Sequence, residues 1–284
     1  MTRIMVSMIY AFLLGSIFLH PKYWTSLETQ WSEHQASGLI GTIFLSLNVI
    51  GTAAMTMAIP VAKRVRDVFY KHRASGMIEH NAMFVAMLVA ELPYLLLMAV
   101  LYVVVYCATA GLFTTFTNFF WFVFFFFMHT ASFSYFAQCF MCLVRDEKTV
   151  GALQGAWIGL NLFYAGFVVL PQNFFSFFKS GLWMNATRYA FEGIVFSQFE
   201  GISSSVVADK ENHSPFYTSL RQNGQCSVDT VECSGTAIEY ASFYFGEKFS
   251  ASNRGLDVGM LLAWIFLANF GTWICLKNLQ YVNT

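Results

Sequence analysis

The chain has 284 residues, of which 57% are hydrophobic, 18% aromatic and only 11% charged, and its formal net charge is zero. Soluble domains are about 45–50% apolar and about 25% charged, so a water-soluble protein of this size could not bury this much apolar surface. The composition therefore indicates a membrane protein, and the zero net charge gives no reason to expect a nucleic-acid partner.

Six apolar segments follow one another along the chain, and we expect each to be a membrane-spanning helix, because the alternation typical of a membrane β-barrel is absent. A helix needs roughly 20 apolar residues to cross the hydrocarbon core, and only the first segment is shorter. That segment resembles a signal-peptide core but lacks a small-residue cleavage site, so we interpret it as a span. The predicted spans are residues 4–19, 38–61, 81–112, 116–144, 151–170 and 256–276.

The stretch KRVRDVFYKHRASG, residues 63–76, holds five of the 16 Lys and Arg residues and one histidine. With the N-terminus in the cytoplasm, the inside segments carry nine Lys and Arg, whereas the two short outside loops carry only Lys22. This asymmetry follows the positive-inside rule, so we expect a cytoplasmic loop. Charge alone favours a topology anchor beside anionic lipid headgroups. The aromatic residues within DVFY are equally compatible with a docking surface for a cytoplasmic partner.

The segment between the fifth and sixth spans has two parts. Residues 172–200 are aromatic but interrupted by charges, which predicts amphipathic or re-entrant helices at the outer interface. Residues 201–255 are polar and predict a small extracellular lobe. Cys226 and Cys233 lie in this lobe, where a local disulfide suits the oxidising outer face, although free thiols or pairing with another chain are alternatives. Asn212 begins a glycosylation sequon in the lobe, and a second sequon begins at Asn185.

Glu91 lies about eleven residues into the third span, within AELPY. A carboxyl group at that depth must face the protein interior with a partner or be protonated. Pro93 frees a backbone carbonyl and kinks the helix, which indicates a hinge or a polar bridge. Structural bracing and conformational switching both stay open for this pair.

Two other motifs favour packing over chemistry. Cys139 and Cys142 have CxxC spacing but no second pair or nearby histidine, so we expect two thiols packed as small apolar groups. His129 has no acidic partner on its helix face and lies beside Thr130 in what we interpret as a polar helix–helix seam.

The fifth span contains the sequence pattern GxxxGxxxG, formed by Gly151, Gly155 and Gly159. Such a face lets a neighbouring helix approach closely. Phe167 and Val168 follow at the end of the span, where they suit either a hydrophobic gate at a subunit interface or plain packing. GxxxxGK[ST], HExxH and GxSxG are absent from the sequence, so no enzymatic chemistry is visible in it.

The motifs VFYKHRASGM (68–77), AELPY (90–94) and TRYAFEG (187–193), with six spans and a two-cysteine lobe, resemble the ABC-2-type membrane domain of ABC transporters. The resemblance is to subfamily G and its pleiotropic drug resistance branch, in which these motifs read like VFYRERASGMY and EIPY. Each motif is short, but their order and spacing cover nearly all of residues 1–284. The predicted fold is thus an all-α polytopic membrane domain with six transmembrane helices, re-entrant helices and a small extracellular lobe.

The resemblance implies a coupling helix that begins at 63–76 and contacts a nucleotide-binding domain, with 145–148 as a second cytoplasmic contact. The residues expected to make these contacts are Arg66, Phe69, Tyr70, Lys71, His72, Arg73, Arg145 and Lys148. Two such membrane domains would pair around a substrate cavity between their second and fifth spans. Phe44 and Asn48 would line the cavity, and Phe167 and Val168 would occupy the apolar valve.

The family exports lipids, sterols and hydrophobic xenobiotics, with ATP and Mg bound by the partner nucleotide-binding domain and no cofactor in a chain such as this one. We therefore expect a non-enzymatic membrane component, at the plasma membrane, of an ATP-driven exporter. Family members carry an ATPase domain and an amphipathic connecting helix ahead of the first span, whereas this sequence starts with the span, as a fragment or a protein with a separate ATPase chain would. The alternative from a different class is a channel subunit or scaffold that does not use ATP.

Overall fold

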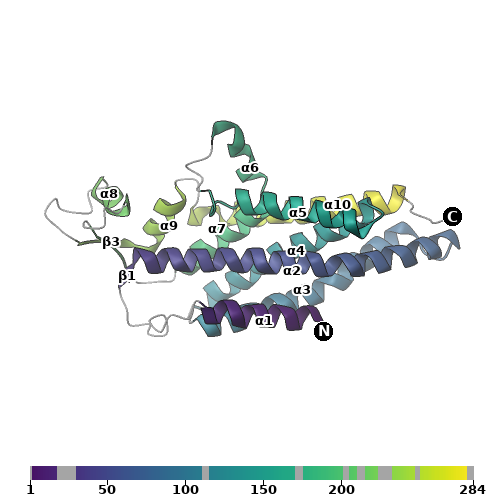
Figure 1. Cartoon of the computed structure of the whole chain (residues 1–284), viewed down its shortest axis with the longest axis horizontal. Coiled ribbons are helices and arrows are strands. Elements are labelled where there is room, and N and C mark those ends of the chain that lie inside the picture. Colours follow the sequence, from purple (N-terminus) through teal and green to yellow (C-terminus); the bar gives the residue numbers. More distant parts are fainter. Residues whose placement is uncertain are drawn as a thin grey trace.

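The computed structural model describes residues 2–17, 30–110, 115–169, 175–200, 205–209, 215–222, 232–246 and 250–279, and it is mainly helical (Figure 1). Its α-helices are α1 (Thr2–Ile17), α2 (Glu33–Ala74), α3 (His80–Ala110), α4 (Phe116–Leu143), α5 (Glu147–Tyr164), α6 (Lys179–Trp183), α7 (Ala186–Phe199), α8 (Pro215–Gln222), α9 (Ala237–Phe245) and α10 (Arg254–Asn278). Two short 3₁₀ turns are η2 (Ser176–Phe178) and η3 (Ala251–Asn253), and three short strands are β1 (Gln30–Ser32), β2 (Ser205–Asp209) and β3 (Glu232–Thr236).

Within these described residues, four helices are long and apolar enough to cross a membrane, namely α2, α3, α4 and α10. The helices α1 and α5 are shorter, with 16 and 18 residues. The prediction of a helical membrane protein is therefore confirmed. That α1 and α5 also cross the bilayer stays a prediction.

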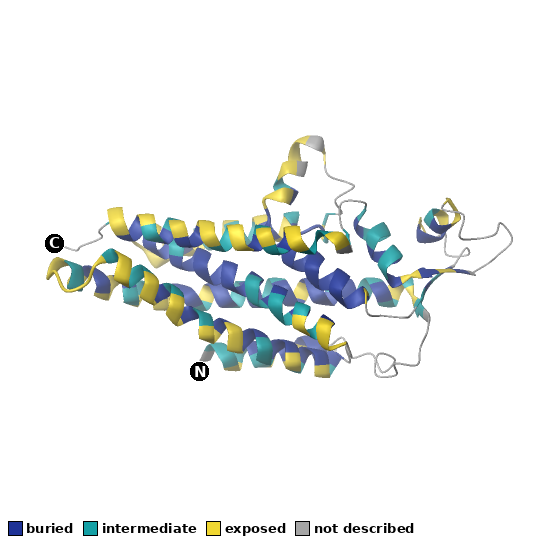
Figure 2. Cartoon of the chain, turned by 180° about the vertical axis from the view of Figure 1, so that it is seen from behind, coloured by how far each residue is buried: buried dark blue, intermediate teal, exposed yellow. Residues whose placement is uncertain are grey.

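The helix α4 lies at the centre of the bundle and packs against α2, α10, α7 and α3. Its phenylalanine-rich sequence suits this position, because Phe122, Phe125, Phe126 and Phe133 are fully buried. The helix α1 packs against α3 and α2 at one side, and α5 packs against α2, α4 and α7. The outer faces of the bundle are exposed and the inner faces are buried, as Figure 2 shows. This burial pattern agrees with an apolar outer surface that faces lipid.

The longest helix, α2, begins with a capping box in which Ser32 and Gln35 satisfy each other's backbone N–H groups. Its 42 residues span about 63 Å at 1.5 Å per residue, twice the hydrocarbon thickness. The basic stretch 63–76, predicted as a loop, is therefore almost entirely helical and forms the tip of α2. The chain turns at Gly76, whose φ of 72° is readily adopted by glycine, and α3 follows at His80.

A three-stranded sheet departs from the predicted all-α fold. The strand β1 precedes α2 and pairs in parallel with β2, which pairs with β3 in antiparallel register, so that Trp31 lies opposite Val206 and Val206 opposite Gly235. These strands lie at the end of the molecule opposite the tip of α2 (Figure 1). Cys233 of β3 is disulfide-bonded. Its predicted partner Cys226 and the predicted glycosylation site Asn212 lie outside the described residues.

The helix α7 was expected at the membrane interface, but all 14 of its residues are buried among the other helices. This burial excludes an amphipathic helix lying on the outer surface, because the polar side chains that motivated it find partners inside the protein, whereas a re-entrant helix stays a prediction. Glu192 accepts hydrogen bonds from Ser250 N at 3.0 Å and from Asn253 Nδ2 at 2.8 Å, and it lies 3.6 Å from Arg188 Nη2. Burial raises the pKa of the Glu192 carboxyl, while these partners act in the opposite direction.

The Asn185 sequon is likewise buried. Its side chain accepts from Arg188 N and donates to the Asn161 carbonyl at 2.9 Å, so it caps α7 and joins it to α5. A glycan cannot be carried by a side chain in this position, since the amide nitrogen that would be modified is already used inside the protein.

Gly193 lets α7 and α4 approach closely. A Cβ at this position would lie 2.4 Å from the Phe125 ring, which is itself fully buried. We expect Gly193→Ala to lower the free energy of unfolding by about 1–3 kcal/mol through overpacking. Thermal unfolding of the purified protein in detergent measures the change.

The matched control is Gly259→Ala on α10, where an added Cβ meets nothing within 4 Å. This variant should unfold at or slightly above the temperature of the original protein, since alanine is the better helix former. Equal stability of the two variants would contradict the close approach of α4 and α7.

Candidate coupling and translocation site

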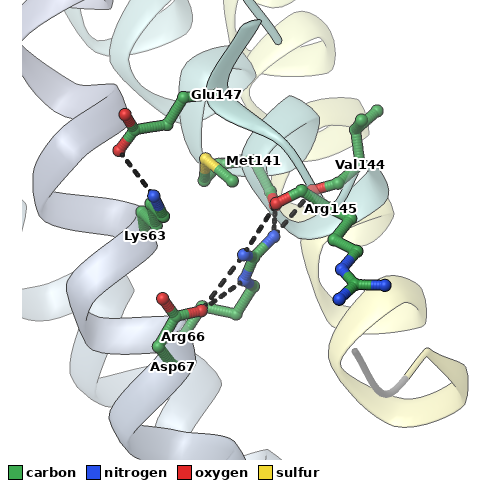
Figure 3. A network of polar contacts seen from close by, with 7 residues as sticks. All are labelled: Lys63, Arg66, Asp67, Met141, Val144, Arg145 and Glu147. Carbon is green, nitrogen blue, oxygen red and sulfur yellow. Dashed lines mark hydrogen bonds and ion pairs between the residues drawn. The ribbon is translucent and has the colours of Figure 1, made fainter. Parts of the chain in front are cut away.

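Arg66, near the C-terminal tip of α2, contacts the end of α4. Its Nη1 atom donates to the carbonyl oxygens of Met141 and Val144, both at 2.6 Å, and Nη2 donates to Arg145 O at 3.2 Å (Figure 3). The last carbonyl groups of a helix have no partner within the helix, and a cation at this end also favours the helix dipole. Arg66 therefore caps α4, and Asp67 neutralises the guanidinium from 3.1 Å.

Arg73 plays the same part for α10. Its Nη1 donates to Leu276 O at 2.7 Å, and Nη2 donates to Lys277 O at 3.1 Å. Because Arg73 follows Arg66 by seven residues, or two helical turns, both guanidinium groups lie on the same face of α2. The tip of α2 thus binds the C-terminal ends of two other helices, α4 and α10.

A third link joins α2 to α5, since Lys63 Nζ lies 3.3 Å from Glu147 Oε1 in the first turn of α5 (Figure 3). This ion pair is partly exposed and contributes little by itself, since such surface pairs are worth about 0–1 kcal/mol. It marks the point at which the first turn of α5 lies against α2.

The predicted coupling residues fall into two groups. Arg66, Phe69 and Tyr70 are buried against neighbouring helices of the same chain, so their expected contact with a partner stays a prediction. Arg73 and His72 are half-buried. The side chains that stay exposed are Lys71, Arg145 and Lys148.

Phe167, expected at the valve, packs against α2. Its ring stacks on Phe44 at a centroid distance of 4.5 Å, and the Phe191 ring of α7 lies 5.6 Å from Phe44. Gly41 allows this contact, since a Cβ there would come within 3.2 Å of Phe167. Val168 is 52% exposed and does not join this aromatic cluster.

Two features position the backbone just before Phe167: a turn at Gly166 and a hydrogen bond between α5 and α7. Gly166 adopts a φ of 88°, a conformation that favours glycine and ends α5. Asn161, in the last turn of α5, accepts from Thr187 Oγ1 of α7 at 3.1 Å. Asn48, the second expected cavity residue on α2, is half-buried and donates to Phe44 O at 2.9 Å within its own helix.

The glycine face of α5 has no neighbour within this chain. An added Cβ at Gly151, Gly155 or Gly159 would meet no described atom within 4 Å. Only Val150 and Asn161 are buried among residues 147–164. The close helix approach that this pattern predicts is therefore not made inside the described part of the chain.

Glu91 is buried and has the partner that its position requires. Arg3 Nη1 donates to Glu91 Oε1, and Arg3 Nη2 donates to Met57 O at 2.8 Å. Pro60 lacks an N–H group, which loosens the hydrogen bonding of α2 next to this carbonyl. The arrangement joins α1, α2 and α3, which favours the bracing role of Glu91. Pro93 lies inside a continuous α3.

Direct contacts support the interpretation that His129 and Cys139 of the CxxC motif serve helix packing. His129 is fully buried, and its Nε2 lies 3.0 Å from Leu47 O, against Gly51 of α2. Cys139 Sγ packs on Gly271 of α10, where a Cβ would come within 2.7 Å of it. Both side chains therefore lie in helix–helix seams around α4.

The fold and this site define a class: a helical membrane domain whose longest helix carries a cationic tip. The model of the ABC-2 type transporter family matches residues 1–199. The chain therefore belongs to the ABC-2 type transporter family, which confirms the resemblance seen in its motifs.

Curated relatives are members of the ABC transporter G family. The chain is 22% identical to member 31 of Arabidopsis thaliana over 286 aligned residues, which cover 99% of the chain and 18% of that protein. It is 24% identical to member 36 of Oryza sativa subsp. japonica, over 98% of the chain and 17% of that protein. Member 2 of Dictyostelium discoideum is 27% identical over 71% of the chain and 15% of that protein. The chain thus spans less than a fifth of the length of these relatives.

Replacement of Arg66 tests the capping role. We expect Arg66→Met to lower the free energy of unfolding by about 2–3 kcal/mol, because charged hydrogen bonds to the α4 carbonyls are lost. Arg64→Met, which changes an exposed neighbour, is the control and should stay within about 0.5 kcal/mol. Thermal unfolding in detergent compares the two. An Arg66→Met protein as stable as the Arg64→Met protein would exclude a structural role for the guanidinium.

Proposed function

We propose that this chain is the membrane-spanning, substrate-translocating part of an ATP-driven exporter of hydrophobic or amphipathic compounds such as lipids, sterols and xenobiotics. Its family membership supports transport across a membrane. The observation that carries the coupling to ATP is the tip of α2, where Lys71 stays exposed while Arg66 and Arg73 bind the ends of α4 and α10.

The proposed coupling depends on this arrangement, in which some cations of the α2 tip bind other helices and others stay exposed. A nucleotide-binding domain, which would bind ATP and Mg, contacts Lys71 on α2 and Arg145 and Lys148 between α4 and α5. Acidic side chains on that domain would complement these cations, and their interaction falls with salt, as it does for exposed charges. Because α2 holds α4 and α10 through short hydrogen bonds, a push on the tip moves three helices together.

The proposed translocation path runs along the part of α2 that carries Phe44 and Asn48. A second membrane domain, in the same polypeptide or a dimer partner, packs against the glycine face of α5, where small residues permit close helix contact. The cavity between the two domains is bounded by Phe44 and Asn48 and closed by the stacked pair Phe44–Phe167. Apolar substrates pass when this stack opens. The plasma membrane is the proposed location.

Charge reversal at the exposed cations tests the coupling. In the complete transporter, the double variant Lys71→Glu and Lys148→Glu should retain ATPase activity and membrane insertion but lose most dye efflux from vesicles, about tenfold or more. The reason is that repulsion replaces attraction at the contact.

The control is Arg221→Glu on α8, an exposed cation at the opposite end of the molecule. This substitution changes the charge by the same amount as each substitution in the double variant does. It should leave dye efflux unchanged. Normal efflux in the double variant would remove the coupling role of the tip.

The valve is tested by Phe167→Ala. Loss of the ring opens the stack with Phe44, so we expect substrate to leak back and net efflux to fall several-fold while ATPase activity persists. Phe266→Ala, at an exposed position of α10, changes the same residue type outside the stack. If both variants pump like the original transporter, Phe167 does not close the path.

A further inference from the structure

A pocket of about 510 Å³ lies among α1, α2 and α3, at the side of the bundle. Ligand-binding pockets are commonly about 300–1,000 Å³. Its floor contains Leu95 and Met98, which are buried, whereas Val61 and Tyr94 at the rim are 45% and 59% exposed. The walls are therefore mainly apolar and open toward the surrounding lipid.

The pocket has a polar end formed by Arg3 and Glu91. Arg3 uses two N–H groups, one to Glu91 Oε1 and one to Met57 O. An arginine has five N–H donors, so three of them have no partner among the described residues. The second carboxylate oxygen of Glu91 accepts no hydrogen bond from the described residues either. The pair thus offers both donors and an acceptor, with a net charge of zero.

The two ends of the pocket follow the membrane normal. Met98 comes seven residues after Glu91, about 10 Å further along α3 and away from the cytoplasmic end of that helix. Arg3 lies in the first turn of α1, and Lys63 follows Met57 by six residues toward the α2 tip. The helix α3 has 31 residues, more than one crossing needs, and Arg3 precedes the first predicted span, so the contact of Arg3 with Glu91 indicates that Glu91 lies nearer the inner surface than its place in the predicted third span suggests. With the α2 tip in the cytosol, the polar end then faces the inner leaflet surface and the apolar end faces the bilayer centre. This is how an inner-leaflet lipid is oriented.

The pocket is separate from the proposed translocation path. At 100° per residue, Met57 and Pro60 lie about 140–160° around α2 from Phe44, and about 20 Å from it along the helix axis. The pocket also involves α1, which does not contribute to the Phe44–Phe167 stack.

We propose that this pocket binds one inner-leaflet phospholipid with a phosphoethanolamine headgroup. The phosphate oxygens accept from the remaining N–H groups of Arg3, and the ammonium group donates to Glu91. An acyl chain lies along Leu95 and Met98. A zwitterionic headgroup suits the neutral ion pair, whereas a purely anionic headgroup would be repelled by Glu91. The proposal needs only the membrane position of α1–α3 and not the transport activity.

Lipid retention tests the proposal directly. The purified protein is delipidated in mild detergent and exposed to equal amounts of phosphatidylethanolamine, phosphatidylcholine and phosphatidylglycerol, without nucleotide. Native mass spectrometry then counts the retained lipids. We expect one phosphatidylethanolamine per chain, retained about tenfold more than either competitor, a ratio that one charge-assisted hydrogen bond can provide.

Two tryptophan variants decide whether the lipid occupies this pocket. Val61→Trp fills the rim and should abolish retention. Val104→Trp is the matched control, because Val104 is 47% exposed on α3 but does not line the pocket, and it should retain the lipid as the original protein does. Both positions are exposed, so neither variant disturbs the buried core. Retention by both variants would place the lipid elsewhere and overturn the proposal.

Charge variants identify the headgroup contacts. Arg3→Gln should lower retention of phosphatidylethanolamine and phosphatidylcholine alike, because the phosphate contact is lost. Glu91→Gln should remove only the preference for phosphatidylethanolamine, because the quaternary ammonium of phosphatidylcholine cannot donate to it. Equal retention of all three lipids by the original protein, or highest retention of phosphatidylglycerol, would overturn the proposal. Transport by the complete exporter is measured separately, so its loss does not affect this result.

Discussion

The end of the molecule around the α2 tip depends on one requirement, that the last carbonyl groups of a helix must find donors. Arg66 meets it for α4 with three hydrogen bonds, and Arg73 meets it for α10 with two. A guanidinium suits this role because it presents several N–H groups in a fixed plane. The basic stretch thus has a structural role in capping other helices. Those of its cations that make no such contact, such as Lys71, are exposed and available to a partner.

The same requirement governs the polar groups inside the bundle. Neither lipid nor an apolar core offers hydrogen bonds, so a buried charge is costly unless a group within the protein pairs with it. Glu91 is paired by Arg3, and Glu192 is surrounded by Arg188, Ser250 and Asn253. These pairs join helices that are far apart in sequence. They therefore fix the relative positions of helices that apolar packing alone would leave free to slide.

Much of this architecture could be predicted from the sequence, and the failures have a common cause. Composition and hydropathy located the helices, and the short motifs indicated the family. The need of Glu91 for a partner was evident, but Arg3 lies 88 residues away, and nothing in the local pattern points to it. The clustering of charge at 63–76 was visible, whereas the carbonyls that Arg66 caps, 75 to 79 residues later, were not. The aromatic segment around α7 was placed at the interface because its polar residues had no visible partners nearby.

The burial of α7 also has a consequence for how the protein is made. The groups that satisfy Glu192 come from Ser250 and Asn253, which the ribosome adds more than fifty residues after α7. Until that part of the chain is translated, Glu192 lacks these partners, and α7 has no stable place inside the bundle. We therefore expect α7 to reach its final position only after Ser250 and Asn253 have been translated, which makes the burial of this helix one of the last steps of folding.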